Sequence, residues 1–281
     1  MSHDLFDDEV LTAKYRLHRP NYPKKVYEHI VDYYYTGKIV NEKIPLALDV
    51  GCGSGQATAD LGLFCEHVIG IDVSPNQIFH AIEKDNIEYK HHTAEDLSFL
   101  ESNSVDLITA ATTLHWLDIE IFLDEAKRVL KPHTGVLAVW TYALGTLDNP
   151  IADAIYHEFS HVLLFSYWNI KRWLADDYYE SLVPLLPYKT TLRQFTIEQR
   201  TEITLGHFLG FIESLSACQT YRKQNGEQAY QNILSTLRYK LIQCYVKTKL
   251  RNSNDETVDF DSIKMIVSSP IRLYLMKKNQ M

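Results

Sequence analysis

The sequence is poor in cysteine and has no cysteine pair of the spacing that binds metals. Four cysteines occur in 281 residues, at Cys52, Cys65, Cys218 and Cys244, and none belongs to a C-x-x-C motif. Structural zinc sites need such closely spaced thiolates, and disulfide scaffolds occur in much shorter chains. We therefore predict no metal site and expect reduced, mostly buried thiols.

The sequence also lacks a basic block and a long hydrophobic run. Lys and Arg number 28 against 36 Asp and Glu, which gives a formal net charge of -8. Nucleic-acid binding needs clustered cations, so a nucleic-acid partner is not expected. No apolar run reaches membrane-spanning length, and the first ten residues are acidic rather than apolar. The composition predicts a cytoplasmic protein with no membrane partner.

Between residues 44 and 142, strand-length apolar runs alternate with helical stretches. The runs are PLALDV, HVIGIDV, VDLITAA and GVLAVWT. Continuous apolar strands separated by helices are typical of an α/β fold, in which helices cover both faces of a parallel sheet. We predict a helical segment over 1–43, with a helix starting near Pro23, and an α/β core over 44–142.

After residue 142 the alternation stops and aromatic residues become frequent. Residues 148–183 read as helical, and residues 205–221 and 229–246 read as two further helices. TLRQFTIE and SPIRLYLMKK read as strands. We predict that residues 143–281 form a helical cap together with the last strands of the sheet. The aromatic stretch Tyr156–Trp173 is interpreted either as a lid over a pocket or as a helix that covers the sheet.

Three of the eleven glycines lie within five residues, in the segment GCGSG directly after the first apolar run. A strand that ends at Val50 must turn sharply there into a helix that begins near Gln56. Glycine allows positive φ and lets a ligand approach the backbone, and the following helix offers free N–H groups. Gly51, Gly53 and Gly55 therefore predict a nucleotide-cofactor site at the carboxyl end of the strand.

Two cofactor classes fit such a loop. The dinucleotide fingerprint G-x-G-x-x-G has its third glycine one residue later than this sequence does. Asp49, just before the first glycine, would be a poor neighbour for a pyrophosphate and suits a ligand with an ammonium group. An NAD-dependent oxidoreductase remains an alternative, and the glycine spacing and Asp49 count against it.

The segment LALDVGCGSGQ resembles motif I of the class I S-adenosylmethionine-dependent methyltransferases. Later segments resemble that family in the same order: VIGIDVS, HHTAEDLSF, VDLITAATTLHWLD and EAKRVLKPHTGVLAV. The resemblance implies a Rossmann-like fold with a mostly parallel seven-stranded sheet, helices on both faces and a helical insertion after strand five. AKYRLHRPNYP, HW and VWTY further resemble the trans-aconitate-methyltransferase-like subgroup, several members of which methylate small carboxylic acids.

The resemblance implies S-adenosylmethionine as cofactor and assigns residues to it. Asp72, 21 residues after Gly51, would accept hydrogen bonds from both ribose hydroxyls. Many members of the family carry Asp where Thr93 stands, near the adenine. Arg16 or Arg19 would pair with the cofactor carboxylate. The full predicted set is Tyr15, Arg16, Arg19, Asp49, Gly51, Cys52, Gly53, Gln56, Asp72, Val73, Thr93, Ala94, Glu95, Ala110, Ala111 and Trp116.

The predicted reaction is in-line displacement at the cofactor methyl by a small-molecule acceptor, for which a carboxylate fits best. A carboxylate is ionised at neutral pH and needs no base, whereas an alcohol or phenol would need one, and His115 would then be the first choice. The candidate acceptor residues are Trp140, Tyr142, His161, Arg172 and Arg222. The alternative is a regulatory or scaffolding protein that binds the cofactor with little turnover, because the motifs report binding only.

Overall fold

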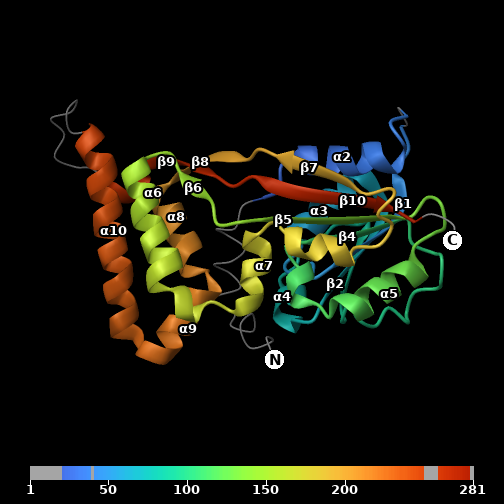
Figure 1. Ribbon diagram of the computed structural model, residues 1–281, viewed down its shortest axis with the longest axis horizontal. Helices are drawn as coiled ribbons and strands as arrows, with labels where there is room; N and C mark the ends of the chain where they lie inside the picture. The colour runs from blue at the N-terminus through green and yellow to red at the C-terminus, as the bar shows by residue number, and fades with distance from the viewer. Residues whose placement is uncertain (1–20, 39–40, 250–258, 279–281) are drawn as a thin grey trace.

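The computed structural model describes residues 21–38, 41–249 and 259–278. Figure 1 shows a sheet flanked by helices at one end of the molecule and a group of helices at the other. The sheet carries the candidate site.

The main sheet has seven strands in the order β3-β2-β1-β4-β5-β10-β7. All neighbouring pairs from β3 to β5 are parallel, and β10 is antiparallel to both of its neighbours. This confirms the predicted Rossmann-like fold with a mostly parallel seven-stranded sheet. The strands are β1 (Ile44–Val50), β2 (Cys65–Asp72), β3 (Ile87–His91), β4 (Leu107–Ala111), β5 (Val136–Tyr142), β7 (Arg193–Ile197) and β10 (Ile271–Lys277).

Apolar side chains on both faces of the strands explain why helices cover both faces. Successive residues of β1 point to opposite sides, so Leu48 packs in one hydrophobic core and Ala47 in another. The first core includes Phe122 of α5 (Ile119–Val129), and the second includes Val26 and Ile30 of α2 (Lys24–Tyr34). The helix predicted near Pro23 is confirmed, and Pro23 stands just before its first turn. α3 (Gln56–Phe64) packs beside α2, and α4 (Pro75–Phe79) follows β2.

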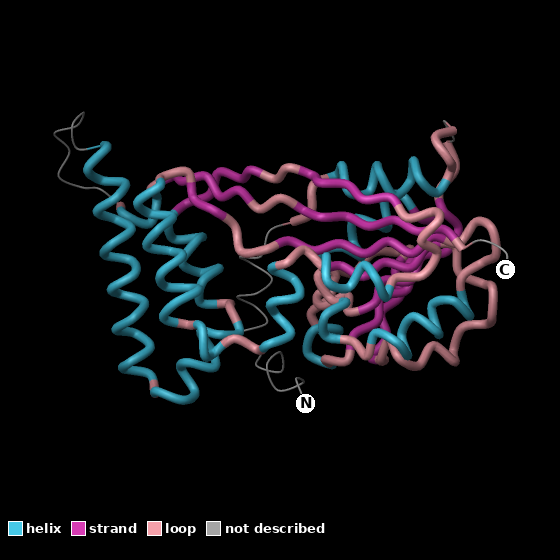
Figure 2. The backbone as a smooth tube through the Cα atoms, in the orientation of Figure 1, coloured by secondary structure: helices cyan, strands magenta, loops and turns pink. Residues whose placement is uncertain are grey.

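Three strands of the main sheet continue beyond it into a second, three-stranded sheet. β6 (Thr146–Leu147) follows β5, β8 (Arg200–Thr204) follows β7, and β9 (Lys264–Ser268) precedes β10. The order β6-β9-β8 therefore repeats the order β5-β10-β7. Figure 2 shows these strands running from the main sheet towards the distant helices. They form the connection between the α/β core and the helical end.

Among the described residues, four α-helices surround a core of their own at the helical end. They are α6 (Pro150–His157), α8 (Leu205–Glu213), α9 (Ser216–Asn225) and α10 (Glu227–Lys249). Tyr156, Phe208 and Leu237 are buried in this core, and the Tyr156 and Phe208 rings meet edge to face at 5.1 Å. Of the described helices, none is both long and apolar enough to cross a membrane.

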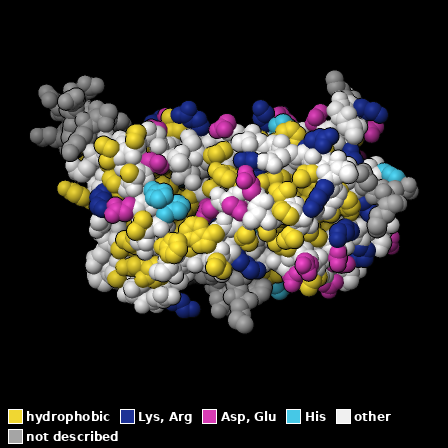
Figure 3. Space-filling view, viewed as in Figure 1, with side chains coloured by type: hydrophobic (Ala, Val, Ile, Leu, Met, Phe, Trp, Pro, Cys, Tyr) yellow, Lys and Arg dark blue, Asp and Glu magenta, His cyan; other side chains and the backbone are white. Residues whose placement is uncertain are grey.

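The aromatic stretch after β5 is not the continuous helix that the sequence predicted. α6 passes into a π-helix over Glu158–Leu163, two 3-10 turns follow, and α7 (Trp173–Asp176) is short. Tyr178 and Tyr179 both have positive φ, which ends any helix there. Val162, Phe165 and Ile170 are exposed, and Figure 3 shows many hydrophobic side chains on this face of the molecule.

Two other helix predictions were too long. Residues 205–221 form α8 and α9 with a break at Leu215, whose extended backbone buries its side chain in the helical core. The segment PNQIFHAIEK after β2 has a helical pattern, but α4 ends at Phe79, and beyond it the Ile82 N–H donates to the Ser54 carbonyl beside the glycine loop. None of the four cysteines, all of them described residues, forms a disulfide, and all but Cys244 are buried.

Candidate functional site

The glycine loop connects β1 to α3 at the carboxyl end of the strand. Gly51, Gly53 and Gly55 all have positive φ, as the predicted turn requires. A Cβ on Gly55 would lie 2.2 Å from the Tyr89 hydroxyl oxygen, so this position needs glycine for packing. A Cβ on Gly53 would meet no atom nearer than 3.8 Å. Gly53 therefore presents an open stretch of backbone, which a ligand can approach.

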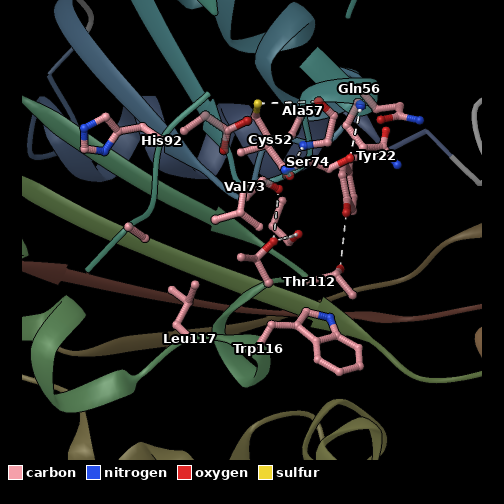
Figure 4. Close-up of a pocket in the computed structure, with 18 of the residues that line it drawn as sticks. Tyr22, Cys52, Gln56, Ala57, Val73, Ser74, His92, Thr112, Trp116 and Leu117 are labelled. Carbon is pink, nitrogen blue, oxygen red and sulfur yellow. Dashed lines mark hydrogen bonds between the residues drawn. The ribbon is translucent and has the colours of Figure 1, made fainter. Parts of the chain in front are cut away.

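A pocket opens beside this loop, at the carboxyl ends of β1, β2, β4 and β5. Figure 4 shows His92 at one end, Gln56 and Tyr22 at the other, and Thr112 and Trp116 below the glycine loop. Sequence analysis selected many of its lining residues: Asp49, Gly51, Cys52, Gly53, Gln56, Asp72, Val73, Ala94, Ala111, Trp116 and Tyr142. Their predicted contacts with a cofactor remain predictions, but the fold brings these residues together.

Asp49 is fully buried at the pocket wall and is held by two threonine hydroxyls. Thr58 Oγ1 donates to Asp49 Oδ2, and Thr109 Oγ1 donates to Asp49 Oδ1, both at 2.6 Å. Burial raises the pKa of Asp49 to about 6, and the two hydroxyls act in the opposite direction. Burial disfavours the ionised form of Asp49, so a cationic group of a ligand placed near this carboxylate would stabilise its charge.

Asp72 organises the glycine loop. Its Oδ2 accepts a hydrogen bond from the Gly53 N–H at 2.9 Å, and its Oδ1 accepts one from the Ser74 N–H at 2.8 Å. Burial raises the pKa of Asp72, and these two N–H groups act to lower it. Each carboxylate oxygen can accept more than one hydrogen bond, so Asp72 can hold the loop and still accept from a ligand hydroxyl.

Two buried amide atoms in the pocket wall have no hydrogen-bond partner among the described residues. They are Gln56 Nε2 and Gln77 Oε1. Buried polar groups in proteins are nearly always hydrogen-bonded, so a donor and an acceptor left open in a pocket indicate a polar ligand. Together with the open backbone at Gly53, they fit a nucleoside-containing cofactor.

Several lining residues were missed by sequence analysis: Tyr22, Ala57, Ser74, Gln77, His92, Thr112, Thr113 and Leu117. Ser74 and Gln77 stand two and five positions after Asp72, so their nearness to β2 could have drawn attention to them. Thr112 has a φ of 53°, an uncommon value for a threonine, which no sequence pattern indicated. Tyr22 reaches the pocket from a segment far away in the sequence.

Other predicted cofactor residues are not among the lining residues. Thr93 donates a hydrogen bond to Glu95, and Glu95 Oε1 accepts from the Asp118 N–H at 2.8 Å, at the start of α5. Ala110 is buried within β4. Tyr15, Arg16 and Arg19 lie outside the described residues.

His115 is not placed to act as a general base. Its side chain is 2% exposed, its Nδ1 lies 2.7 Å from the Tyr179 hydroxyl, and His115 is not among the lining residues of the pocket. Burial lowers the pKa of the imidazole to about 3, with smaller contributions from the positive charges of Arg172 and Lys171. A base with so low a pKa would take up a proton poorly at neutral pH.

Of the predicted acceptor residues, Tyr142 lines the pocket. Trp140 is fully buried behind it, with its ring 5.4 Å from that of Tyr22. His161 stacks on His157, Arg172 pairs with Asp176, and Arg222 pairs with Glu227. These three candidates therefore have partners of their own outside the set of lining residues.

The part of the pocket wall formed by Tyr22, Thr112, Trp116 and Tyr142 carries aromatic and hydroxyl groups. Tyr22 Oη lies 3.2 Å from Thr112 Oγ1, and the Tyr22 ring meets that of Tyr142 at 6.3 Å. Behind Trp116, Lys171 Nζ donates to its carbonyl oxygen at 3.2 Å. Over the described part of the chain, no group of three or more His, Cys, Asp or Glu side chains is placed to hold a metal ion.

Comparison with known proteins identifies the sequence family. A family model described as a methyltransferase domain matches residues 48–139. A Dictyostelium discoideum protein named as a methyltransferase is 31% identical over 277 residues, which are 97% of this chain and 96% of that protein. A Saccharomyces cerevisiae protein named as an S-adenosylmethionine-dependent methyltransferase, CRG1, is 25% identical over 76% of this chain and 81% of its own.

Solved structures agree with the sequence matches. A protein from Anaeromyxobacter dehalogenans, described as a type II methyltransferase, superimposes with a TM-score of 0.72 at 27% identity. The superposition covers 92% of this chain and 97% of that one. These matches decide against the oxidoreductase alternative, as the glycine spacing also did.

Proposed function

The chain belongs to the class I S-adenosylmethionine-dependent methyltransferases, and on that premise we propose that it methylates a carboxylate of a small molecule. S-adenosylmethionine supplies an activated methyl group, so the protein has to hold the cofactor, align the acceptor and exclude water. The proposed acceptor agrees with the trans-aconitate-methyltransferase-like subgroup that the sequence resembles. A cytoplasmic location is part of the same proposal and rests on the sequence alone.

The pocket offers a chemically suitable contact for each part of the cofactor. Asp72 would accept hydrogen bonds from the ribose, and Asp49 would face the ammonium group. Gln56 Nε2, which has no partner among the described residues, would donate to the cofactor carboxylate. His92 lies at the end away from Gln56, and together with Ala94, another lining residue, it would flank the adenine.

The observation that carries the proposed acceptor is the composition of the pocket wall that Tyr22, Thr112, Trp116 and Tyr142 form. Tyr22, Thr112 and Tyr142 supply hydroxyl groups, which can donate hydrogen bonds to a carboxylate, and Trp116 supplies an apolar surface. His115, the residue first considered as a base, is buried and bonded to Tyr179. A carboxylate acceptor needs no base, because it is already ionised at neutral pH.

A positive charge near this wall also favours an anionic acceptor. Lys171 Nζ lies against the Trp116 carbonyl and uses one of its three donors there. The described lining residues contain two carboxylates, Asp49 and Asp72, and no Lys or Arg. An anion that enters such a pocket is repelled by the carboxylates, so a cation at the wall would offset part of that repulsion.

The proposal is tested by transfer of a tritiated methyl group from S-adenosylmethionine into separate pools of carboxylic acids, alcohols, amines and thiols. We expect counts in the carboxylic-acid pool that are released by mild base, as methyl esters are. The Asp72→Ala variant should lose them, and Gln194→Met, on the exposed part of β7, should keep them. Base-stable counts confined to another pool would overturn the carboxylate assignment.

A further inference from the structure

Gln77 is a buried amide in the pocket wall that neither the sequence motifs nor the proposed function uses. It lies on α4, the short helix directly after β2, and its side chain is turned inward with only 3% of the residue exposed. Its backbone N–H donates to Ser74 Oγ at 3.3 Å, which fixes the first turn of the helix. Gln77 is therefore held in place from its backbone and lines the pocket.

The side-chain oxygen of Gln77 lacks a partner where a ligand would lie. Gln77 Oε1 is buried without a hydrogen bond from any described residue. It points at the glycine loop, because a Cβ built on Gly53 would lie 3.8 Å from it. Leaving such an acceptor dry and unpaired destabilises the protein, so a donor from the ligand is expected.

The same glycine also contacts Asp72, so two acceptor side chains lie beside Gly53. The Gly53 N–H donates to Asp72 Oδ2 at 2.9 Å, on the loop that Gln77 Oε1 faces. Two oxygens that can only accept cannot satisfy each other. A ligand with two neighbouring hydroxyl groups can satisfy both, since each hydroxyl donates one hydrogen bond. The ribose of a nucleoside has that arrangement.

We propose that Gln77 is a further cofactor-binding residue, whose Oε1 accepts a hydrogen bond from one ribose hydroxyl while Asp72 accepts from the other. This inference rests on the cofactor site of the proposed function and divides the ribose between two residues. The sequence analysis had given both hydroxyls to Asp72. Gln77 then selects a ligand with an intact diol rather than any adenine derivative.

The test is a cycle of substitutions in the protein and in the ligand, measured by calorimetry. S-adenosylhomocysteine and its 2′-deoxy and 3′-deoxy analogues are titrated into the wild type and Gln77→Met, which keeps the length but loses the amide. We expect Gln77→Met to weaken S-adenosylhomocysteine binding about 5- to 20-fold, as for one buried hydrogen bond. One of the two deoxy analogues should bind wild type and Gln77→Met with equal affinity, because it lacks the hydroxyl that would donate a hydrogen bond to Gln77 Oε1.

Additional variants separate this role from a loss of structure. Gln77→Leu also removes the amide, with a side chain of a different shape, and should show the same pattern of affinities for the three ligands. Gln194→Met should bind all three ligands as the wild type does. Equal losses for all three ligands in the Gln77 variants, or no loss at all, would overturn the assignment. Failure of the wild type to bind S-adenosylhomocysteine would instead contradict the proposed cofactor site itself.

Discussion

His115 Nδ1 and the Tyr179 hydroxyl lie 2.7 Å apart in a part of the molecule that solvent does not reach. The bond joins the turn after β4 to the insertion after β5, 64 positions further along the chain. His115 is followed directly by Trp116, which lines the pocket, and the two rings are 4.6 Å apart. The insertion therefore supports the pocket wall through a residue that would otherwise be taken for a catalytic base.

The first prediction concerns this bond. Tyr179→Phe removes the hydroxyl and leaves the imidazole without that partner, so the free energy of unfolding should fall by about 1–3 kcal/mol. Methyl transfer at saturating substrates should stay within about threefold of wild type, a factor worth under 1 kcal/mol, because no proton passes through His115. Urea unfolding and single-turnover kinetics measure the two effects. A loss of rate of a hundredfold or more in a folded variant would indicate that His115 takes part in the chemistry.

Asp49 gives the second prediction, which concerns pH and stability. Its pKa is raised from 3.8 to about 6, so the folded state binds more protons than the unfolded state between these values. Stability should therefore fall as pH rises through this window, by about 3 kcal/mol for two pKa units.

Asp49→Asn supplies the control for this effect, because it cannot ionise. Both proteins are unfolded with urea at pH 4, 5, 6 and 7, without cofactor. As pH increases, the wild type should lose stability relative to Asp49→Asn. A difference that does not change with pH would contradict a raised pKa at Asp49.

The third prediction separates the two roles of glycine in the loop. Gly53→Ala places a methyl group in open space, so its cost to folding should be the roughly 1–2 kcal/mol of a left-handed alanine. Its cofactor affinity should fall at least tenfold, since the methyl group enters the ligand space. Gly55→Ala should destabilise more, because the new Cβ displaces the Tyr89 hydroxyl and its bond to the Ile82 carbonyl. Thermal unfolding measures the two losses of stability, and calorimetry measures the cofactor affinity. An unchanged cofactor affinity in Gly53→Ala would contradict a loop that faces the ligand.

Lys171 gives the fourth prediction. Lys171→Met should raise the KM for an anionic acceptor about two- to fivefold, the range for a solvent-exposed charge pair, and should leave cofactor affinity unchanged. Lys171→Arg should retain most of the wild-type KM, and Lys223→Met, an exposed lysine on α9, serves as the matched control. Steady-state kinetics at low and high salt provide the measurement. An unchanged KM for the anionic acceptor in Lys171→Met would remove the argument for charge at this wall.

The sequence predicted the parts of the molecule that depend on local patterns. The apolar runs predicted the main strands. The glycine loop, Asp49 and Asp72 predicted one side of the pocket, because they lie close together in the chain. Tyr22 and Gln77 were missed because their place depends on how α2 and α4 pack on the sheet. His115 and Arg172 were considered as functional groups because a sequence does not reveal burial or an existing partner such as Tyr179 or Asp176.

The insertion after β5 shows a second limit of sequence patterns. Its aromatic residues have a helical spacing, but their packing follows from the helical core that α6, α8 and α10 build together. The π-helix over Glu158–Leu163 contributes Phe159 to that core, whereas Tyr179, which has positive φ, packs in the core of the main sheet beside Phe122. Hydrophobic periodicity identifies which residues are buried, but it does not identify where a helix must break to bury them.

Methyl transfer without a general base is tested most directly by the pH dependence of a single turnover. Enzyme saturated with labelled S-adenosylmethionine is mixed with a carboxylic-acid acceptor at pH values from about 6.5 to 9, above the usual carboxyl pKa. The predicted result is a rate that does not change across this range, in the wild type and in Tyr179→Phe alike. A rate that rises tenfold per pH unit to a plateau near neutrality would show a titrating base in the pocket and would contradict the carboxylate mechanism.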